Sequence, residues 1–268
     1  MFPRGRPHRM TRLRHLTIDS SQRTPTEILP QMVHLKSLEI KISQTNAATT
    51  TASRPFVNLC DFTELEQLYI QGDVWSRVQE DFTGKSYTIQ TCILEGPLVV
   101  GKRSDDFFER IATGLRAIFC QGTHLVGELE TTFPRLEFLA MHKTIHSTGT
   151  FPFRNSTIRA VSLEIDDSYG PGRLQDSNDF LHLVLTNTKS TLRFLALRSG
   201  LVWAPSLITI QSFQQMACLS VLMLDGALAF GRHDWTALFR SSNLDLVATI
   251  ETWIESGVSR PSKFRHTT

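Results

Sequence analysis

A short pattern of hydrophobic positions recurs along the chain and predicts a repeated structural unit. Each copy has an apolar residue, two variable residues, a second apolar residue, one variable residue and a third apolar residue. Nine copies occur: Leu13/Leu16/Ile18, Leu35/Leu38/Ile40, Leu65/Leu68/Ile70, Ile89/Cys92/Leu94, Leu115/Ile118/Cys120, Leu136/Leu139/Met141, Ile158/Val161/Leu163, Leu192/Leu195/Leu197 and Leu219/Leu222/Leu224. Self-similarity at intervals of 20 to 50 residues is typical of repeat architectures.

The spacing within each copy predicts a short strand. The second and third apolar residues are two positions apart, so they share one face of a strand. The first apolar residue lies three positions earlier, which suits a bend that leads into the strand. One unit of this size cannot bury its apolar edge alone, so stacked units are expected to form a parallel sheet over a continuous core.

Neighbouring columns support the same register. A polar residue follows the triplet in all nine copies, and a glycine comes next in four of them, at Gly72, Gly96, Gly122 and Gly226. A polar residue followed by glycine is typical of a strand that ends in a turn. Helices are expected between strands at 105–112, 179–185 and 206–216, and they would form the convex side of the sheet.

Three copies carry a resemblance to a known family. The segments 35–40 (LKSLEI), 65–70 (LEQLYI) and 136–141 (LEFLAM) resemble the leucine-rich-repeat core L-x-x-L-x-L. The irregular spacing is most similar to the ribonuclease-inhibitor-like superfold and to the repeats of fungal F-box-associated proteins. The chain departs from the family at the asparagine or cysteine column, where it has Ser21, Ser43, Asp73, Pro97, Thr123, Thr144, Asp166, Gly200 and Ala227.

We therefore predict an α/β leucine-rich-repeat solenoid with a curved parallel sheet and irregular convex helices. Residues 1–12 are expected to be a basic N-terminal arm, 13–258 the solenoid, and 259–268 a disordered tail. Leu246, Val247, Ile250, Trp253 and Ile254 fall at helical spacing. This spacing predicts a C-terminal helix that caps the last repeat.

Composition narrows the classes of function. Of the 268 residues, 41% are hydrophobic and 20% charged, and the net charge is +2. This balance argues against a dedicated nucleic-acid binder, and no apolar run is long enough for a membrane helix. None of the four cysteines lies in a Cys-x-x-Cys pair, and Cys92 and Cys120 occupy repeat positions, so buried thiols are expected in the cytoplasm or nucleus.

One segment suggests an alternative function, that of an enzyme or nucleotide-binding protein. Residues 96–104 (GPLVVGKRS) nearly match the phosphate-binding loop G-x-x-x-x-G-K-[ST]. However, Arg103 stands where a hydroxyl group would hold magnesium, and Asp105 and Asp106 place negative charge near the expected phosphate. The repeat explains this segment more simply, as a connection between the fourth and fifth copies.

No catalytic, cofactor-binding or metal-binding residue is predicted. The nine histidines form no His-Glu-x-x-His motif. His142 and His146 are four positions apart, which suits a metal only on a helix, whereas His142 is expected to end a strand. A Gly-x-Ser-x-Gly elbow is also absent from the sequence. We expect a binding protein, not an enzyme.

The resemblance implies protein recognition on the repeat surface, as in F-box proteins that select substrates for a ubiquitin ligase. Residues 1–12 are too short to contain an F-box. The partner's identity and the oligomeric state are left open by the sequence.

The expected partner site is the face of the sheet that points away from the core. The residues two and four positions after each first apolar residue should lie there. They are mostly polar in the first three copies and become apolar later in the chain. We predict that Phe119, Phe138, Phe194 and Met223 anchor a partner protein or the chain's own tail. In the alternative, a loop or the C-terminal segment covers this face.

Overall fold

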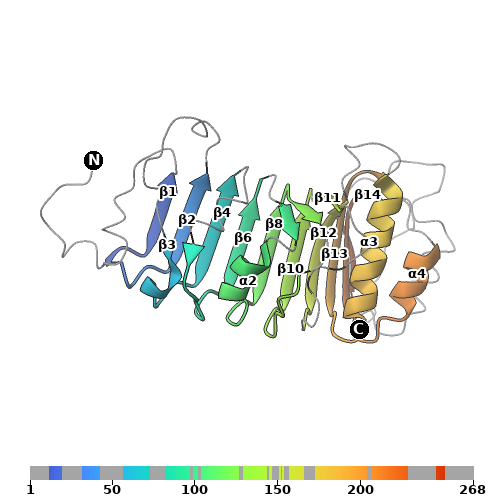
Figure 1. The fold of residues 1–268 in the computed structure, drawn as a ribbon. Helices are drawn as coiled ribbons and strands as arrows, with labels where there is room; N and C mark the ends of the chain where they lie inside the picture. The colour runs from blue at the N-terminus through green and yellow to red at the C-terminus, as the bar shows by residue number, and fades with distance from the viewer. Residues whose placement is uncertain are drawn as a thin grey trace, which may run out of the picture.

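Ten parallel strands form one sheet and follow one another across it in chain order (Figure 1). In the computed structural model they are β1 (His15–Asp19), β2 (Ser37–Ile42), β4 (Gln67–Gly72), β6 (Thr91–Glu95), β8 (Ala117–Gln121), β10 (Phe138–His142), β12 (Ala160–Ile165), β13 (Phe194–Trp203), β14 (Val221–Leu228) and β15 (Leu246–Ile250). The structure describes residues 12–19, 32–42, 57–72, 82–96, 99–101, 104–126, 129–143, 145–146, 151, 153, 157–165, 173–203, 207–228 and 246–250.

The strands pair in the register that the triplets predict. Leu38 lies opposite Leu16 on one side and Leu68 on the other, and Leu195 lies opposite Val161 and Leu222. The same position is aligned in all nine copies. The α/β class and the parallel order of the strands are therefore as predicted.

Burial follows the register. The second and third triplet residues are at most 6% exposed in every copy except the first, where Leu16 is only partly buried. Leu139 and Leu195 are fully buried, and Leu222 is 1% exposed. The first triplet residue is also buried from Leu35 onward. The repeat thus supplies a continuous core along one face of the sheet.

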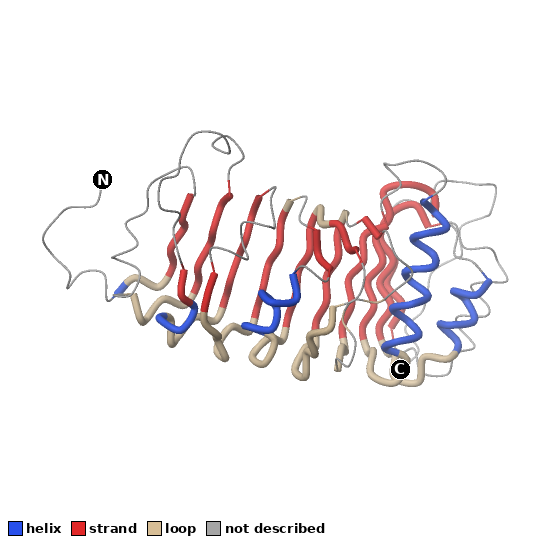
Figure 2. The backbone as a smooth tube through the Cα atoms, in the orientation of Figure 1, coloured by secondary structure: helices blue, strands red, loops and turns tan. Residues whose placement is uncertain are grey.

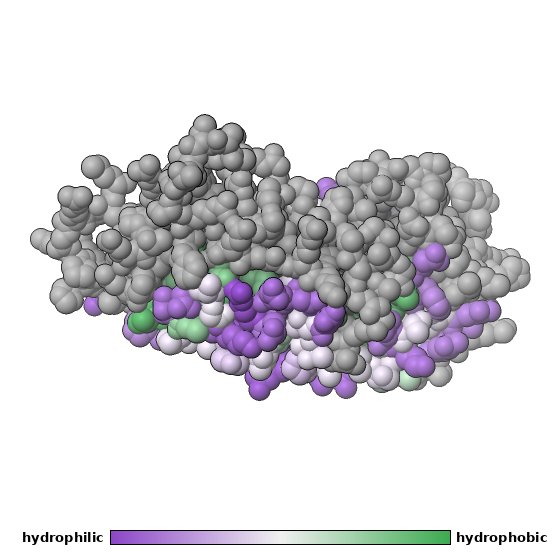
Figure 3. All heavy atoms as spheres, in the orientation of Figure 1, coloured by the Kyte–Doolittle hydropathy of each residue, from purple (hydrophilic) through white to green (hydrophobic). Residues whose placement is uncertain are grey.

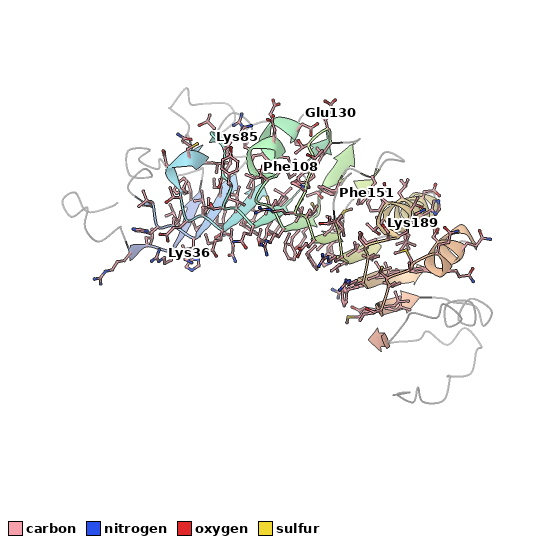
Figure 4. The ribbon with its side chains drawn as sticks, turned by 90° about the horizontal axis from the view of Figure 1, so that it is seen from below. Lys36, Lys85, Phe108, Glu130, Phe151 and Lys189 are labelled. Atoms are coloured by element: carbon pink, nitrogen blue, oxygen red, sulfur yellow. The ribbon has the colours of Figure 1, made fainter. Side chains whose placement is uncertain are left out.

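Helices and small strands cover this buried face. They are β3 (Val57–Asn58), the 3-10 helix η4 (Leu59–Asp61), β5 (Phe82–Thr83), β7 (Val99–Gly101), α2 (Asp105–Ile111), β9 (His124–Val126), β11 (Ile145–His146), α3 (Arg173–Thr188) and α4 (Leu207–Gln214). The sheet curves, and α2, α3 and α4 lie on its outer side (Figure 4). The three expected helices therefore form, and β3, β5, β7, β9 and β11 add two small parallel sheets that the pattern did not predict.

A column of phenylalanine rings packs beneath the strands. Phe82, Phe107, Phe108, Phe133 and Phe153 contact one another in sequence, with ring centroids 5.5–5.6 Å apart in edge-to-face geometry. This is the arrangement that aromatic quadrupoles prefer. The column extends through Phe151 to Phe180 of α3. It joins units whose connecting segments differ in length.

The strands begin at a regular backbone ladder. One carbonyl of each unit, such as that of Arg116, accepts hydrogen bonds from two successive amides of the next unit, here Glu137 and Phe138, at 2.9 and 3.0 Å. The described loops and turns gather along this edge of the sheet (Figure 2). At the other end of β6, Gly96 has φ +107°, and a Cβ atom there would lie 2.7 Å from the carbonyl oxygen of Gly72. Only glycine fits this turn.

The predicted C-terminal capping helix is wrong. Leu246–Ile250 form strand β15, which pairs in parallel with β14 and places Val247 opposite Leu222. Without a further strand, the backbone N–H and C=O groups on one edge of β14 would have no partners, and β15 supplies these hydrogen bonds. Trp253 and Ile254 of the predicted helix lie outside the described residues, as do the predicted tail at 259–268 and residues 1–11 of the predicted arm.

We predict that Leu139→Ala lowers the free energy of unfolding by about 2–5 kcal/mol, because it leaves a cavity in the closed core. Val33→Ala is the matched control, since Val33 is 37% exposed, and it should cost less than about 0.5 kcal/mol. Urea denaturation followed by circular dichroism measures both. Equal effects of the two substitutions would contradict the assigned core.

The thiols provide a second test of burial. Cys92 and Cys120 are buried, whereas Cys60 and Cys218 are exposed. Burial raises the pKa of Cys120 to about 12, and burial together with the nearby Cys120 also raises the pKa of Cys92. The thiolate is the reactive species, so at pH 8 an aromatic disulfide reagent should titrate two thiols in the native protein and four after unfolding. A Cys60→Ser/Cys218→Ser variant that still reacts while folded would refute this placement.

Candidate functional site: the outward face of the parallel sheet

The face of the sheet opposite the core carries two regular rows of side chains. The first outward row holds the residues two after each first apolar position: His15, Ser37, Gln67, Thr91, Ala117, Phe138, Ala160, Phe194 and Val221. The second outward row holds the residues four after it: Thr17, Glu39, Tyr69, Ile93, Phe119, Ala140, Ser162, Ala196 and Met223. Both rows change from polar to apolar between β4 and β8.

The four predicted anchor residues lie in the apolar part of these rows. Phe119 and Phe138 contact each other on neighbouring strands, with ring centroids 4.9 Å apart. Phe194 lies in the same row as Phe138, with Ala160 between them. Met223 lies one strand beyond Phe194, in the second row, opposite Ala196. All four side chains are partly buried, so each retains some accessible surface.

Small residues separate the larger ones and make the apolar part of the face shallow. Ala117, Ala160 and Ala196 are partly buried, and Ala140 is 3% exposed. Ala140 was expected to be accessible, but its register partner Phe119 lies beside it and shields it. The bulky side chains therefore provide most of the contact surface.

Polar side chains border the face where the strands end. His142 Nε2 lies 2.9 Å from Ser162 Oγ, and Arg198 Nε lies 3.3 Å from Asp225 Oδ2. Partial burial lowers the pKa of His142; Glu164 opposes this shift and Arg198 adds to it. A neutral histidine that shares a hydrogen bond with a serine is a polar rim group, and it leaves the neighbouring apolar surface uncharged near neutral pH.

The N-terminal half of the face is charged, and its charges are paired with one another. Glu64 contacts Arg14 at 2.9 Å and His34 at 2.6 Å, while Lys36 contacts Glu66 at 3.0 Å. The pKa of the Glu64 carboxyl is lowered, chiefly by the hydrogen bond from His34. Glu39 likewise accepts a hydrogen bond from Thr17 and pairs with Lys41.

Sequence reasoning missed a third row, which we call the edge row. It holds the residue directly after each first apolar position, at the carbonyl ladder: Arg14, Lys36, Glu66, Gln90, Arg116, Glu137, Arg159, Arg193 and Ser220. Lys36 lies on the side of the sheet opposite Lys85, Phe108 and Glu130 (Figure 4). The signal was present in the sequence, because four of these nine residues are arginines.

A hollow opens at this edge, with a volume of about 420 Å³. Its lining includes edge-row residues together with residues of the preceding turns: Lys36, Thr63, Glu64, Glu66, Tyr87, Thr88, Gln90, Gly114, Arg116 and Arg135. Tyr87 is 65% exposed. The hollow is polar and open, which suits a charged or hydrogen-bonding side chain better than an apolar ligand.

The helix-bearing side of the molecule differs from the outward face. Where the structure describes it, that surface is mostly hydrophilic, with small hydrophobic patches (Figure 3). No helix among the described residues is long and apolar enough to cross a membrane.

The segment that resembles a phosphate-binding loop has another structure. Val99–Gly101 form strand β7, which pairs with β9. The carboxylate of Asp105, at the start of α2, accepts hydrogen bonds from the amides of Glu130 and Thr131 at 3.0 Å. Lys102 lies outside the described residues. Among the described strands, the sheet order is sequential and differs from that of a doubly wound sheet, in which the order reverses.

Metal-binding and catalytic clusters were not expected. Within the described residues, no group of three or more histidine, cysteine, aspartate or glutamate side chains could hold a metal ion. His142 ends β10 and His146 ends β11, so these two histidines belong to different sheets.

The outward face is thus an extended surface with an apolar part, a polar rim and an arginine-rich edge. These features are typical of a surface that contacts another macromolecule. Comparison of the chain with protein-family models and with curated protein sequences finds no match.

Proposed function

We propose that this protein is a binding scaffold of the leucine-rich-repeat type, a solenoid that recognises a protein partner on the outward face of its sheet. The partner contacts the apolar part of that face, and Phe119, Phe138, Phe194 and Met223 are its anchors. The protein holds the partner and performs no chemistry on it.

One observation carries this proposal. Core formation requires apolar residues only on the inward face of a strand, yet from β8 to β14 the outward rows are also largely apolar. Water would favour polar residues at these positions. Aromatic side chains that stay partly accessible on a rigid surface are favoured at binding interfaces, because little conformational entropy is lost when they are covered.

The regular stacking supports the leucine-rich-repeat assignment. Each of the nine triplets contributes one strand, and the intervals of 21 to 34 residues between triplets are occupied by connections of different structure. Units that contact mainly their neighbours tolerate such variation in length. The resemblance to F-box-associated repeats favours a substrate of a ubiquitin ligase as partner, and such an adaptor would act in the cytoplasm or nucleus.

The proposal predicts that Phe138→Ala with Phe194→Ala weakens partner binding. A random peptide library displayed on phage and selected on the native protein supplies the ligands for this measurement. Affinities of the selected peptides, measured by fluorescence anisotropy, should fall at least about tenfold in the double variant. Thermal unfolding should be nearly unchanged, because both rings lie outside the core.

Gln67→Ala with Tyr69→Ala is the matched control, since these residues occupy the same two rows on β4, in the polar half. It should leave the affinities within about twofold, as expected for residues outside a binding hot spot. Equal losses in both double variants, or no loss in either, would contradict the placement of the site.

The scaffold function also predicts the outcome of a nucleotide test. Lys102→Ala should leave ATP and GTP titrations unchanged, because we expect no saturable binding by either the native protein or the variant. Isothermal titration calorimetry measures this directly. Saturable binding that disappears in Lys102→Ala would favour the alternative, a nucleotide-binding protein with a degenerate phosphate loop at Gly96–Lys102.

A further inference from the structure

Four arginines stand together along the strand-start edge of the apolar surface. They are Arg116, Arg159 and Arg193 of the edge row, and Arg135 in the turn before β10. All four side chains are exposed. Within the described residues, none of them forms an ion pair or a side-chain hydrogen bond. We call this set the arginine edge.

The contrast with the N-terminal half of the same edge is informative. There, Arg14 and Lys36 are neutralised by Glu64 and Glu66. The arginine edge has a single edge-row acid, Glu137, which lies between Arg116 and Arg159 and forms no ion pair in the described part of the chain. Among the described residues, the second half of the edge therefore carries an excess of positive charge that ion pairs do not balance.

The arginine edge adjoins the proposed anchors in the sequence and in the sheet. Arg193 directly precedes Phe194, Arg159 directly precedes Ala160, and Glu137 directly precedes Phe138. Neighbouring strands lie about 4.8 Å apart, and the amide of Arg193 donates to the carbonyl of Arg159, so the two arginines occupy adjacent positions of the edge row beside the apolar rows. A ligand that covers Phe138 and Phe194 must also pass close to both arginines.

The hollow continues this positive border. Arg116 and Arg135 both line it, together with Gln90 and Thr88. Glu64 and Glu66 also line it, but each is already paired with a cation. Among the described residues, the charged side chains of the hollow that form no ion pair are Arg116 and Arg135. A guanidinium group offers the two-pronged geometry that matches a carboxylate.

We propose that the partner segment is acidic: a peptide whose aromatic or aliphatic side chains cover Phe138 and Phe194, and whose aspartate or glutamate side chains contact Arg116, Arg135, Arg159 and Arg193. This inference rests on the proposed function and specifies the chemistry of the partner. The apolar contacts provide affinity, and the charge contacts fix the orientation of the peptide on the face and increase its association rate.

The test compares two double variants with equal loss of charge. Arg159→Gln with Arg193→Gln removes two unpaired cations of the arginine edge. Lys85→Gln with Lys189→Gln removes two exposed cations that lie away from the outward rows and the hollow: Lys85 pairs with Glu109 of α2, and Lys189 directly follows α3. The probes are 12-residue peptides selected from a random phage library, a neutralised version of each in which Asp and Glu are replaced by Asn and Gln, and a 12-nucleotide oligouridylate.

Selected peptides should be enriched in Asp and Glu next to aromatic or aliphatic residues. Their affinity should fall about tenfold in Arg159→Gln/Arg193→Gln and less than about twofold in Lys85→Gln/Lys189→Gln. A tenfold loss corresponds to about 1.4 kcal/mol, which two exposed charge contacts can supply. The neutralised peptides should lose a similar factor. Affinity should also decrease between 50 and 500 mM NaCl, since salt screens exposed charges.

Failure of this inference can be distinguished from failure of the proposed function. Peptides that require Phe138 and Phe194 but show neither acidic enrichment nor sensitivity to Arg159→Gln/Arg193→Gln would overturn the acidic partner and retain the scaffold. Tighter binding of the oligouridylate than of any acidic peptide would overturn it in favour of a nucleic-acid ligand. Peptides that are insensitive to Phe138→Ala/Phe194→Ala would overturn both proposals.

Discussion

The parallel register of the sheet is the constraint on which the rest of the structure depends. At each step one carbonyl of the edge row accepts two amides of the next unit, as Arg159 does from Arg193 and Phe194 at 2.8 and 3.0 Å. This ladder fixes which residue of a new strand faces its neighbour. A slip by one residue would move Leu195 and Leu197 to the outward face and bring Phe194 and Ala196 into the core. Burial of the triplets and the backbone ladder therefore enforce the same register.

The register also separates stability from recognition. The inward face is filled by leucine, isoleucine, valine and cysteine in nearly every unit, so it has little freedom to vary. The outward rows are not required by the core, and their composition changes along the sheet. Strands β1 to β4 carry polar and charged groups that pair with one another, whereas β8 to β14 carry apolar groups bordered by arginines that form no ion pair with the residues the structure describes. The proposed binding function lies in this second part.

The outer side of the sheet, which carries α2, α3 and α4, shows how units of unequal length can stack. Some connections contain a small strand, as β9 between β8 and β10, and others contain a helix, as α3 between β12 and β13. The phenylalanine column links several of these connections through ring contacts, from Phe82 of β5 to Phe180 of α3. The rings contact one another at broadly equivalent places in successive connections. The phenylalanines therefore do not have to recur at a fixed interval in the sequence.

The sequence by itself determined the nine strands, their order and their buried residues. That was possible because apolar residues two positions apart share one face of a strand, whatever the rest of the fold. When such a strand recurs along the chain, stacking the copies in order buries all of these faces together. It also predicted that Phe119 and Phe138 lie on the outward face, and the structure shows that their rings contact each other. Only the tertiary structure decided features that depend on contacts between distant segments. Leu246, Val247 and Ile250 fit a helix or a strand by spacing alone, and the open edge of β14 selected the strand. Likewise, Val99–Gly101 became a strand because β9 lies beside it. Whether an arginine is paired or free could not be predicted either, since Glu64 and Glu66 neutralise Arg14 and Lys36 across strands, while Arg159 and Arg193 form no ion pair in the described part of the chain.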